Sequence, residues 1–332
     1  MSETRTLLTD TADRLFTDLA AHPDAPFAEV WPSIAEAGFE SLLLGEDEGG
    51  FGGDWGDLFA VARLAGSHAL AAPVGEAAVA AWALTRAGLT PAEGLATIAP
   101  AVDGCVENGR FTGSLKATPW GGAAQTVVAT HAGSLLRLQT TDCRIESGHS
   151  PVGEPRDTLT FEGAVAEAAP SDIDLLACGA FLRTAQIAGA LDAALAASIA
   201  YANERVQFGK PISKFQTVQQ TLAIFAIEAA AVNSAGQAAA RAADAGVADF
   251  EFAAAKLRAN IAAGQGAALA HQVHGAIGFT QEHPLHRLTR RLAGWRSEFG
   301  SDRFWAQRLG RRVAGLGPDG LWPELARRSD AA

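Results

Sequence analysis

Apolar side chains recur at helical spacing in the first part of the chain. Leu8, Leu15 and Leu19 lie at i, i+7 and i+11, which places them on one face of a helix. Two further stretches before residue 90 have the same character, and a glycine-rich turn segment over 45–54 interrupts them. The pattern predicts an N-terminal helical domain over residues 1–95.

The pattern changes in the middle of the chain. Short runs over 126–130, 135–138 and 158–161 alternate or are rich in β-branched residues, with Gly, Pro and Asp between them. Such runs are typical of antiparallel strands joined by turns. We therefore expect a small β domain over 96–168.

Long helical patterns return after the predicted β domain. One continuous apolar face is formed by Val218, Leu222, Phe225 and Ala229. Many expected core positions are alanine, so the helices can approach closely, which favours a bundle that oligomerisation extends. The expected fold is mainly α with a small β domain: a helical bundle covers 169–315, and a polar tail with two prolines over 316–332 is loosely held.

Composition and charge narrow the classes of function. The 332 residues are 48% hydrophobic and 19% charged, an ordinary globular composition of about two domains' worth of chain. The net charge of -11 disfavours a nucleic-acid partner, although one or two arginines can still hold a small anionic ligand. The three cysteines are too few and too scattered to form a thiolate metal site, and their small number is consistent with a reducing cytoplasm.

No segment predicts contact with a membrane. The N-terminus carries charges throughout and lacks the apolar core of a signal peptide. The most apolar stretch, 188–202, is alanine-rich and interrupted by Asp192. It predicts a buried helix of a cytoplasmic protein rather than a bilayer span.

Two segments in the predicted bundle carry a family resemblance. Residues 201–220 contain Arg-x-x-Phe-Gly, and residues 272–291 begin Gln-x-x-Gly-Ala-x-Gly-Phe. In this order and about 65 residues apart, they resemble the acyl-CoA dehydrogenase family. The helix–sheet–helix plan matches that family over nearly the whole chain. The resemblance implies a helical first domain, a β-barrel-like middle domain and a C-terminal four-helix bundle.

The resemblance also implies a cofactor, FAD, whose ADP half these segments hold from a neighbouring subunit. An arginine offers a planar fork to phosphate oxygens, and glycines let the backbone approach a pyrophosphate. The residues implied as contacts are Arg205, Gln207, Phe208, Gln216, Gln272, Gly275 and Gly278. Taken singly, the arginine could equally lie on a helix surface, the phenylalanine could be core, and the glycines could merely end a helix.

Other parts of the family pattern are missing. The T-E-P-x-x-G-S-D stretch of the family's middle domain has no counterpart in residues 89–110. The family's W-x-[ST] strand is expected after Lys116, but the sequence there is Ala-Thr-Pro-Trp-Gly-Gly. Pro119 would interrupt a central strand. We therefore expect an eroded surface for a flavin ring in this same chain.

Glu298 is the candidate catalytic base. The family reaction needs a base at the acyl α-carbon. An ungapped count from Pro284 puts Phe299 at one family position for this base, and a one-residue deletion would place Glu298 there instead. The other family position lands near Gly179, where no carboxylate exists. Alternatively, Glu298 is a solvated carboxylate at a helix start.

The sequence keeps the implied cofactor contacts but has an eroded flavin surface. In this combination it resembles the shortened second subunit of α2β2 bacterial acyl-CoA dehydrogenases. That resemblance implies an FAD-dependent enzyme that desaturates an acyl-CoA, with a steroid or other bulky acyl group as one option. It also implies a partner dehydrogenase subunit and an electron-transfer flavoprotein. Two alternatives stay open: a self-sufficient homo-oligomer with Glu298 as base, and a non-catalytic scaffold subunit.

A zinc site is the remaining interpretation of a motif. His271 and His274 form one H-x-x-H pair, and His283 and His286 form another. Both pairs lie in or beside the second motif, and neither has a cysteine or a pair of carboxylates with it. We expect no metal.

Overall fold

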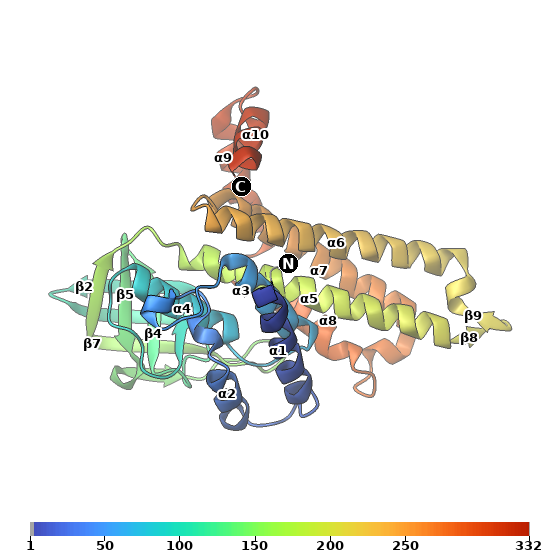
Figure 1. Ribbon diagram of the computed structural model, residues 1–332, viewed down its shortest axis with the longest axis horizontal. Helices are drawn as coiled ribbons and strands as arrows, with labels where there is room; N and C mark the ends of the chain where they lie inside the picture. Colours follow the sequence, from blue (N-terminus) through green and yellow to red (C-terminus); the bar gives the residue numbers. More distant parts are fainter. Residues whose placement is uncertain (1–2, 332) are drawn as a thin grey trace.

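The computed structural model describes residues 3–331, in which a β-sheet lies to one side of two groups of helices that pack directly on each other (Figure 1). The N-terminal helices are α1 (Glu3–Ala20), α2 (Phe27–Glu36), α3 (Trp55–Ser67) and α4 (Val74–Arg86). The C-terminal helices are α5 (Leu175–Glu204), α6 (Gln216–Asp244), α7 (Asp249–His274), α8 (Leu285–Trp295), α9 (Asp302–Leu316) and α10 (Leu321–Ala331). The expected fold class, mainly α with a small β domain, is confirmed.

The helix α3 starts at a capping box that also joins it to α1. The Asp54 carboxylate accepts from the backbone N–H of Asp57, and the Asp57 carboxylate accepts from the N–H of Asp54. Arg5 of α1 donates to both carboxylates, at 2.5 Å to each. The acidic start of α3 thus fixes the angle at which the first helix packs.

The sheet is mostly antiparallel. Its strands are β1 (Ala96–Ile98), β2 (Ala101–Glu107), β3 (Arg110–Pro119), β4 (Thr126–His131), β5 (Ser134–Gln139), β6 (Cys143–Glu146) and β7 (Arg156–Pro170). They follow the order β1-β4-β5-β7-β3-β2, with β6 beside β7 and one parallel pair, β1 with β4. Its own core includes Phe111, Leu115, Leu138 and Phe161, all fully or almost fully buried.

The position of Pro119 differs from the expectation. It was expected to interrupt a central strand, but it is the last residue of β3, where it lies opposite Arg156 of β7. A shift in register between Leu115 and Thr118, with Ala117 at a φ of 53°, bends the strand just before it. A strand end tolerates the missing N–H of proline, and an interior position does not.

The long helices α5, α6 and α7 lie side by side and form the bundle (Figure 1). The first half of α5 is buried on all sides, because α3, α4, α7 and α8 surround it. By length and composition alone α5 and α6 could cross a membrane, but both pack in this bundle.

The segment 316–332 was expected to be a loosely held tail. In the structure its residues 321–331 form α10, which stands away from the bundle together with α9 (Figure 1). Arg328 of α10 pairs with Glu251 at 2.8 Å and with Asp249 at 3.1 Å, both at the start of α7. Ion pairs to another helix, rather than apolar burial, hold this end of the chain.

Glycines allow α3 and α5 to touch. A Cβ atom at Gly66 would lie 2.1 Å from the carbonyl oxygen of Gln186, and one at Gly189 would lie 1.8 Å from that of Arg63. Backbone atoms cannot yield as a flexible side chain can. This crossing therefore sets the distance between the N-terminal helices and the bundle.

We expect Gly189→Ala to lower the free energy of unfolding by about 3 kcal/mol, because it forces the two backbones apart. Gly310→Ala is the matched control: it lies inside α9 with open space around it. Its alanine should raise the free energy of unfolding by roughly 0.5–1 kcal/mol, through helix propensity alone. Denaturant unfolding measures both, and equal effects of the two variants would contradict the close crossing.

Candidate functional site

The first motif forms a hairpin beyond the end of α5. Strands β8 (Val206–Gln207) and β9 (Lys210–Pro211) pair across Phe208 and Gly209, whose φ angles of 51° and 79° make a tight turn. The N–H of Ile212 donates to the carbonyl of Arg205 at 2.8 Å and closes the base of the hairpin. Phe208 is 90% exposed, and the hairpin projects from the far end of the bundle (Figure 1).

The second motif ends α7. Gly275 follows the helix with φ 64° and ψ −144°, a backbone conformation that residues other than glycine rarely adopt. The space in which its side chain would lie is open. Gly278 is buried, and a Cβ there would lie 2.9 Å from the Cβ of His274. Close packing therefore explains why residue 278 is a glycine, whereas Gly275 exposes its backbone to solvent.

An aromatic stack brings the two motifs to one end of the bundle. The ring of Tyr201 stacks on that of His274 with centroids 4.6 Å apart. Arg205 lies one helical turn beyond Tyr201, while Gln272 and Gly275 flank His274. The structure thus groups the segments that the sequence analysis paired.

The expected cofactor residues are mostly solvent-exposed. The exposed ones are Arg205, Gln207, Phe208, Gln216, Gln272 and Gly275. Among residues 3–331, nothing hydrogen-bonds or ion-pairs with the side chains of the arginine and the three glutamines. An arginine fork, three amides and a glycine backbone facing outward form a surface that can bind a phosphate-bearing ligand from outside this chain.

The histidines of the second motif engage aromatic rings. His271 stacks on Phe279 at 4.0 Å, and His274 contacts the rings of both Tyr201 and His283. Burial lowers the pKa of His271 and of His274, and Nδ1 of the first and Nε2 of the second have no hydrogen-bond partner in the described chain. No cluster of three metal-ligating groups occurs within residues 3–331.

Glu298 lies in a different region, between two arginines. Its Oε2 accepts from Nε of Arg183 at 2.7 Å and from the guanidinium of Arg156 at 2.9 Å. Burial alone would raise the pKa of Glu298, but the charges of Arg183 and Arg156 outweigh it and lower the pKa below the usual range. An ionised carboxylate pinned in this way is a weak base.

The two arginines extend the network in both directions. Arg183, fully buried in α5, also donates to Glu76 of α4 at 2.7 Å. Arg156 of β7 binds Glu154 at 3.0 Å, which in turn accepts from Arg291 of α8 at 2.9 Å. We call Glu76, Arg183, Glu298, Arg156, Glu154 and Arg291 the ion ladder. It joins both helical groups and the sheet.

The two family positions for a base face each other, and neither holds a carboxylate. Phe299 is buried with a φ of 50°, and a Cβ at Gly179 would lie 2.0 Å from its ring. Lys256 holds both ends of the loop that carries Phe299, because its ammonium group donates to the carbonyls of Trp295 and Gly300. Burial, and then the charge of Arg183, lowers the pKa of Lys256 to about 7. An apolar ring thus fills the place where the resemblance implies the reacting carboxylate.

The Trp120 region is also filled. Its indole is buried, and the Arg156 guanidinium lies over it with 5.2 Å to the ring centroid. Backbone N–H groups of Gly122 and Gly148 donate to Asp157, which fixes the neighbouring turns. Side chains of this chain therefore occupy the end of β3 where the family places its flavin-ring strand.

Sequence reasoning missed the ladder partners of Glu298. Glu76 and Arg183 stand alone in long apolar runs, and an isolated charge in such a run indicates a buried ion pair. That signal was available. The pairing itself was not, because Glu76 and Arg183 are 107 positions apart and Arg156 and Glu298 are 142 apart.

Known proteins resemble this chain in sequence. The acyl-CoA dehydrogenase C-terminal domain profile matches residues 173–314. The chain is 28% identical to the acyl-CoA dehydrogenase IpdE2 of Mycobacterium tuberculosis, over 80% of each chain. It is 32% identical to the acyl-CoA dehydrogenase FadE34 of the same organism over 84% of its own length, and spans 41% of that relative.

Solved structures share the fold along nearly the whole chain. A chain of the ChsE4-ChsE5 complex from Mycobacterium tuberculosis matches with a TM-score of 0.86 at 23% identity, covering 95% of this chain and 98% of that one. A variant of the Tcur3481-Tcur3483 steroid ACAD matches with a TM-score of 0.85 at 24% identity, covering 94% and 98%. Residues 173–314 therefore carry the acyl-CoA dehydrogenase C-terminal domain, and the relatives and the fold extend the similarity to that family over most of the chain.

Proposed function

We propose that this chain is one subunit of a cytoplasmic, FAD-dependent acyl-CoA dehydrogenase complex. In this proposal it holds the ADP half of an FAD whose flavin ring lies in a partner subunit. One contrast carries the proposal. The cofactor motifs at the end of the bundle are open and unpartnered, while the position for a base at Gly179 and Phe299 is closed and apolar.

The residues at the bundle end suit the ADP half of FAD. Arg205 can contact two phosphate oxygens at once, and the glutamines can bridge to ribose or phosphate oxygens. The open backbone at Gly275 admits a pyrophosphate that a side chain would exclude. When bound, FAD accepts a hydride from the β-carbon of the acyl-CoA. This chain's residues would only position its adenosine end.

A partner chain would supply the base and the flavin-ring surface. The projecting hairpin can reach a neighbouring chain, since its tip residue Phe208 touches only the edge of Phe215 within the described chain and is otherwise exposed. Elsewhere in this chain, the Arg156 guanidinium covers the Trp120 ring and the Phe299 ring closes the position for a base. The arrangement favours one flavin for each pair of unlike subunits.

The outer face of α6 offers a surface for that partner. Ile224 and Ile227 are 51% and 66% exposed, one turn apart, with exposed alanines at 223, 226 and 230. Exposed apolar stripes of this kind mark protein–protein contacts. The stripe begins two turns beyond Gln216, so one partner could cover both the stripe and the cofactor contacts.

The substrate class rests on relatives. Similar structures include a chain of the ChsE4-ChsE5 complex and one described as a steroid ACAD. We propose a steroid or similarly bulky acyl-CoA as substrate of the complex. An electron-transfer flavoprotein would accept the electrons.

The isolated chain should be colourless. Coexpression with its partner subunit should yield a yellow complex with one flavin for each pair of chains, because only the partner retains a flavin-ring surface. Visible absorbance and protein concentration give this ratio. A stoichiometric flavin in the isolated chain would instead favour the self-sufficient homo-oligomer.

Arg205→Ala should reduce the affinity of the complex for FAD by roughly tenfold to a hundredfold, the cost of losing a charge-assisted hydrogen bond. Flavin retained after dialysis measures it. Arg303→Ala is the matched control, since it removes an exposed arginine of α9 without an ion pair. Unchanged flavin in the Arg205 variant, with the complex intact, would favour the scaffold alternative.

Glu298→Gln distinguishes an anchor from a base. We expect kcat of the complex to stay within about threefold, while the free energy of unfolding at pH 7 falls by about 3 kcal/mol because two buried arginines each lose one of their two counter-charges. The lowered pKa of Glu298 means that its stabilisation is present above about pH 4.5 and lost as the pH falls through the native pKa. The difference between wild type and variant should therefore shrink in acid.

The opposite result would identify Glu298 as the base. A loss of kcat by two or more orders of magnitude with unchanged stability would mean that Oε2 leaves its arginines during turnover. Glu282→Gln serves as control, because Glu282 is exposed and has no ion pair in the described chain. It should change neither quantity.

A further inference from the structure

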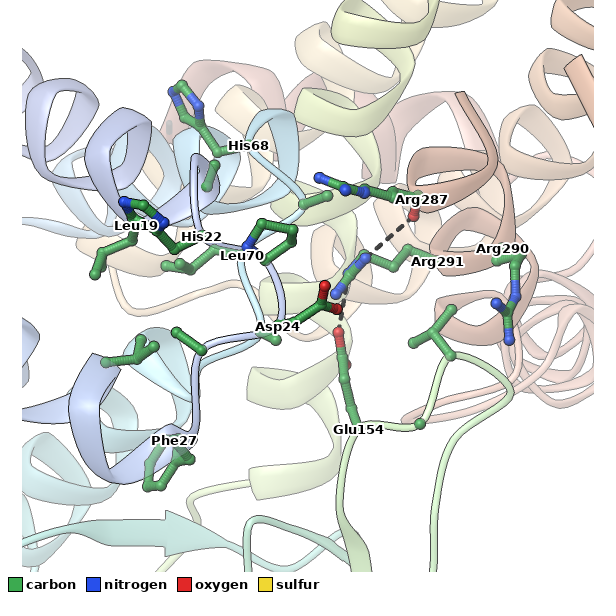
Figure 2. Close-up of a pocket in the computed structure, with 18 of the residues that line it drawn as sticks. Leu19, His22, Asp24, Phe27, His68, Leu70, Glu154, Arg287, Arg290 and Arg291 are labelled. Carbon is green, nitrogen blue, oxygen red and sulfur yellow. Dashed lines mark hydrogen bonds and ion pairs between the residues drawn. The ribbon is translucent and has the colours of Figure 1, made fainter. Parts of the chain in front are cut away.

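A cavity of about 400 Å³ lies where the N-terminal helices, the sheet and α8 meet (Figure 2). The end of α1 and the loop to α2 form one wall, the turn after α3 a second, and the loop before β7 a third. The face of α8 that carries Arg287, Arg290 and Arg291 closes it. None of the proposed FAD contacts, such as Arg205, Gln272 or Gly275, is among the residues that line it.

Arg287 is an arginine of this cavity that has no ion pair within residues 3–331. Its guanidinium extends from α8 toward the turn after α3 (Figure 2), and no carboxylate of residues 3–331 pairs with it. Its neighbours are occupied: Arg291 pairs with Glu154 at 2.9 Å, and Arg290 donates to the carbonyl of Pro151 at 2.6 Å. The first turn of α8 has no acidic residue to offset it.

Positive charge is in surplus around the cavity. Counting the ion ladder with the cavity wall, the arginines are Arg156, Arg183, Arg287, Arg290 and Arg291, and the carboxylates are Asp24, Glu76, Glu154 and Glu298. His22 and His286 also line the wall. In a chain with a net charge of -11, this local surplus favours an anionic ligand.

The opposite wall selects against a bare anion. Asp24 is exposed, faces α8 across the cavity (Figure 2), and has no hydrogen-bond partner in the described chain. A carboxylate there repels free phosphate but accepts hydrogen bonds from hydroxyl groups. Leu19, Val30 and Leu70 add an apolar strip. A fitting ligand therefore carries phosphate at one end, hydroxyl groups beyond it and an apolar ring, as a nucleotide does.

We propose that this cavity is a second nucleotide site, in which Arg287 binds the phosphate and Asp24 accepts from the sugar hydroxyls. The cavity volume exceeds what a single ion fills and suits a ligand of nucleotide size. The site is independent of the FAD contacts at the end of the bundle.

Binding of ADP to the full-length chain carrying Arg205→Ala tests the proposal, because that background removes the proposed FAD contact. Isothermal titration calorimetry should show saturable binding at one site. Adding Arg287→Gln should weaken it at least tenfold, whereas adding Arg303→Gln, which removes an exposed arginine outside the cavity, should leave it unchanged. Arg287→Lys, which keeps the charge, should retain part of the affinity and confirms that the fold is intact.

Pyrophosphate and an Asp24→Asn variant identify which end of the ligand is recognised. The variant should weaken ADP binding and leave or strengthen pyrophosphate binding, because the repulsion is removed. Absence of saturable ADP binding at millimolar concentration would overturn the proposal. Equal losses in the Arg287 and Arg303 variants would also overturn it. If the wild-type chain binds ADP but the Arg205→Ala chain does not, ADP binds at the proposed FAD contacts. That result would overturn the second site and support the proposed function.

Discussion

The buried pairing of Glu298 with Arg183 and Arg156 is the constraint on which the other packing depends. Arg183 is fully buried in the middle of α5, so its charge must be matched or the helix could not pass through the core. Glu76 supplies one counter-charge and Glu298 the other. These pairs bind α4, α5, β7 and the loop after α8 in one arrangement, because any shift would leave a buried charge alone. The ion ladder therefore specifies how the two helical groups and the sheet assemble, and this role outweighs its net contribution to the free energy of unfolding.

Much of the fold followed from local pattern. Helical and alternating apolar spacing predicted both helical groups and the sheet between them, since burying one face is a local requirement of each element. Pro119 shows the limit of such reasoning: its missing N–H excludes a strand interior, but pattern alone does not reveal that the strand ends there. The C-terminal helix α10 was missed because Arg328 and its acidic partners hold it, and ion pairs leave no apolar periodicity.

The pairing of the two motif segments could be predicted from the sequence for a different reason. Their residues are close in sequence within each motif, and the Tyr201–His274 stack joins the two motifs at one end of the bundle. Glu298 could be named from its position in a motif, but its surroundings could not. Its two arginine partners come from α5 and from the start of β7, and only the folded chain brings them together. Candidate residues on a surface are thus easier to infer than the chemical state of one in the core.

The ladder and the cavity share Glu154 and Arg291, which connects the interior with the surface. Glu154 divides its two oxygens between Arg156 and Arg291. An anion that drew Arg291 into the cavity would leave Glu154 to Arg156 alone and strengthen that pair at the expense of Arg156 with Glu298. Arg183 would then be the main partner of the Glu298 carboxylate, while Lys256 and Trp305 would still hold the backbone of the loop. Under the proposed function the base lies in a partner subunit, so such a shift in this chain would leave the reacting groups in place.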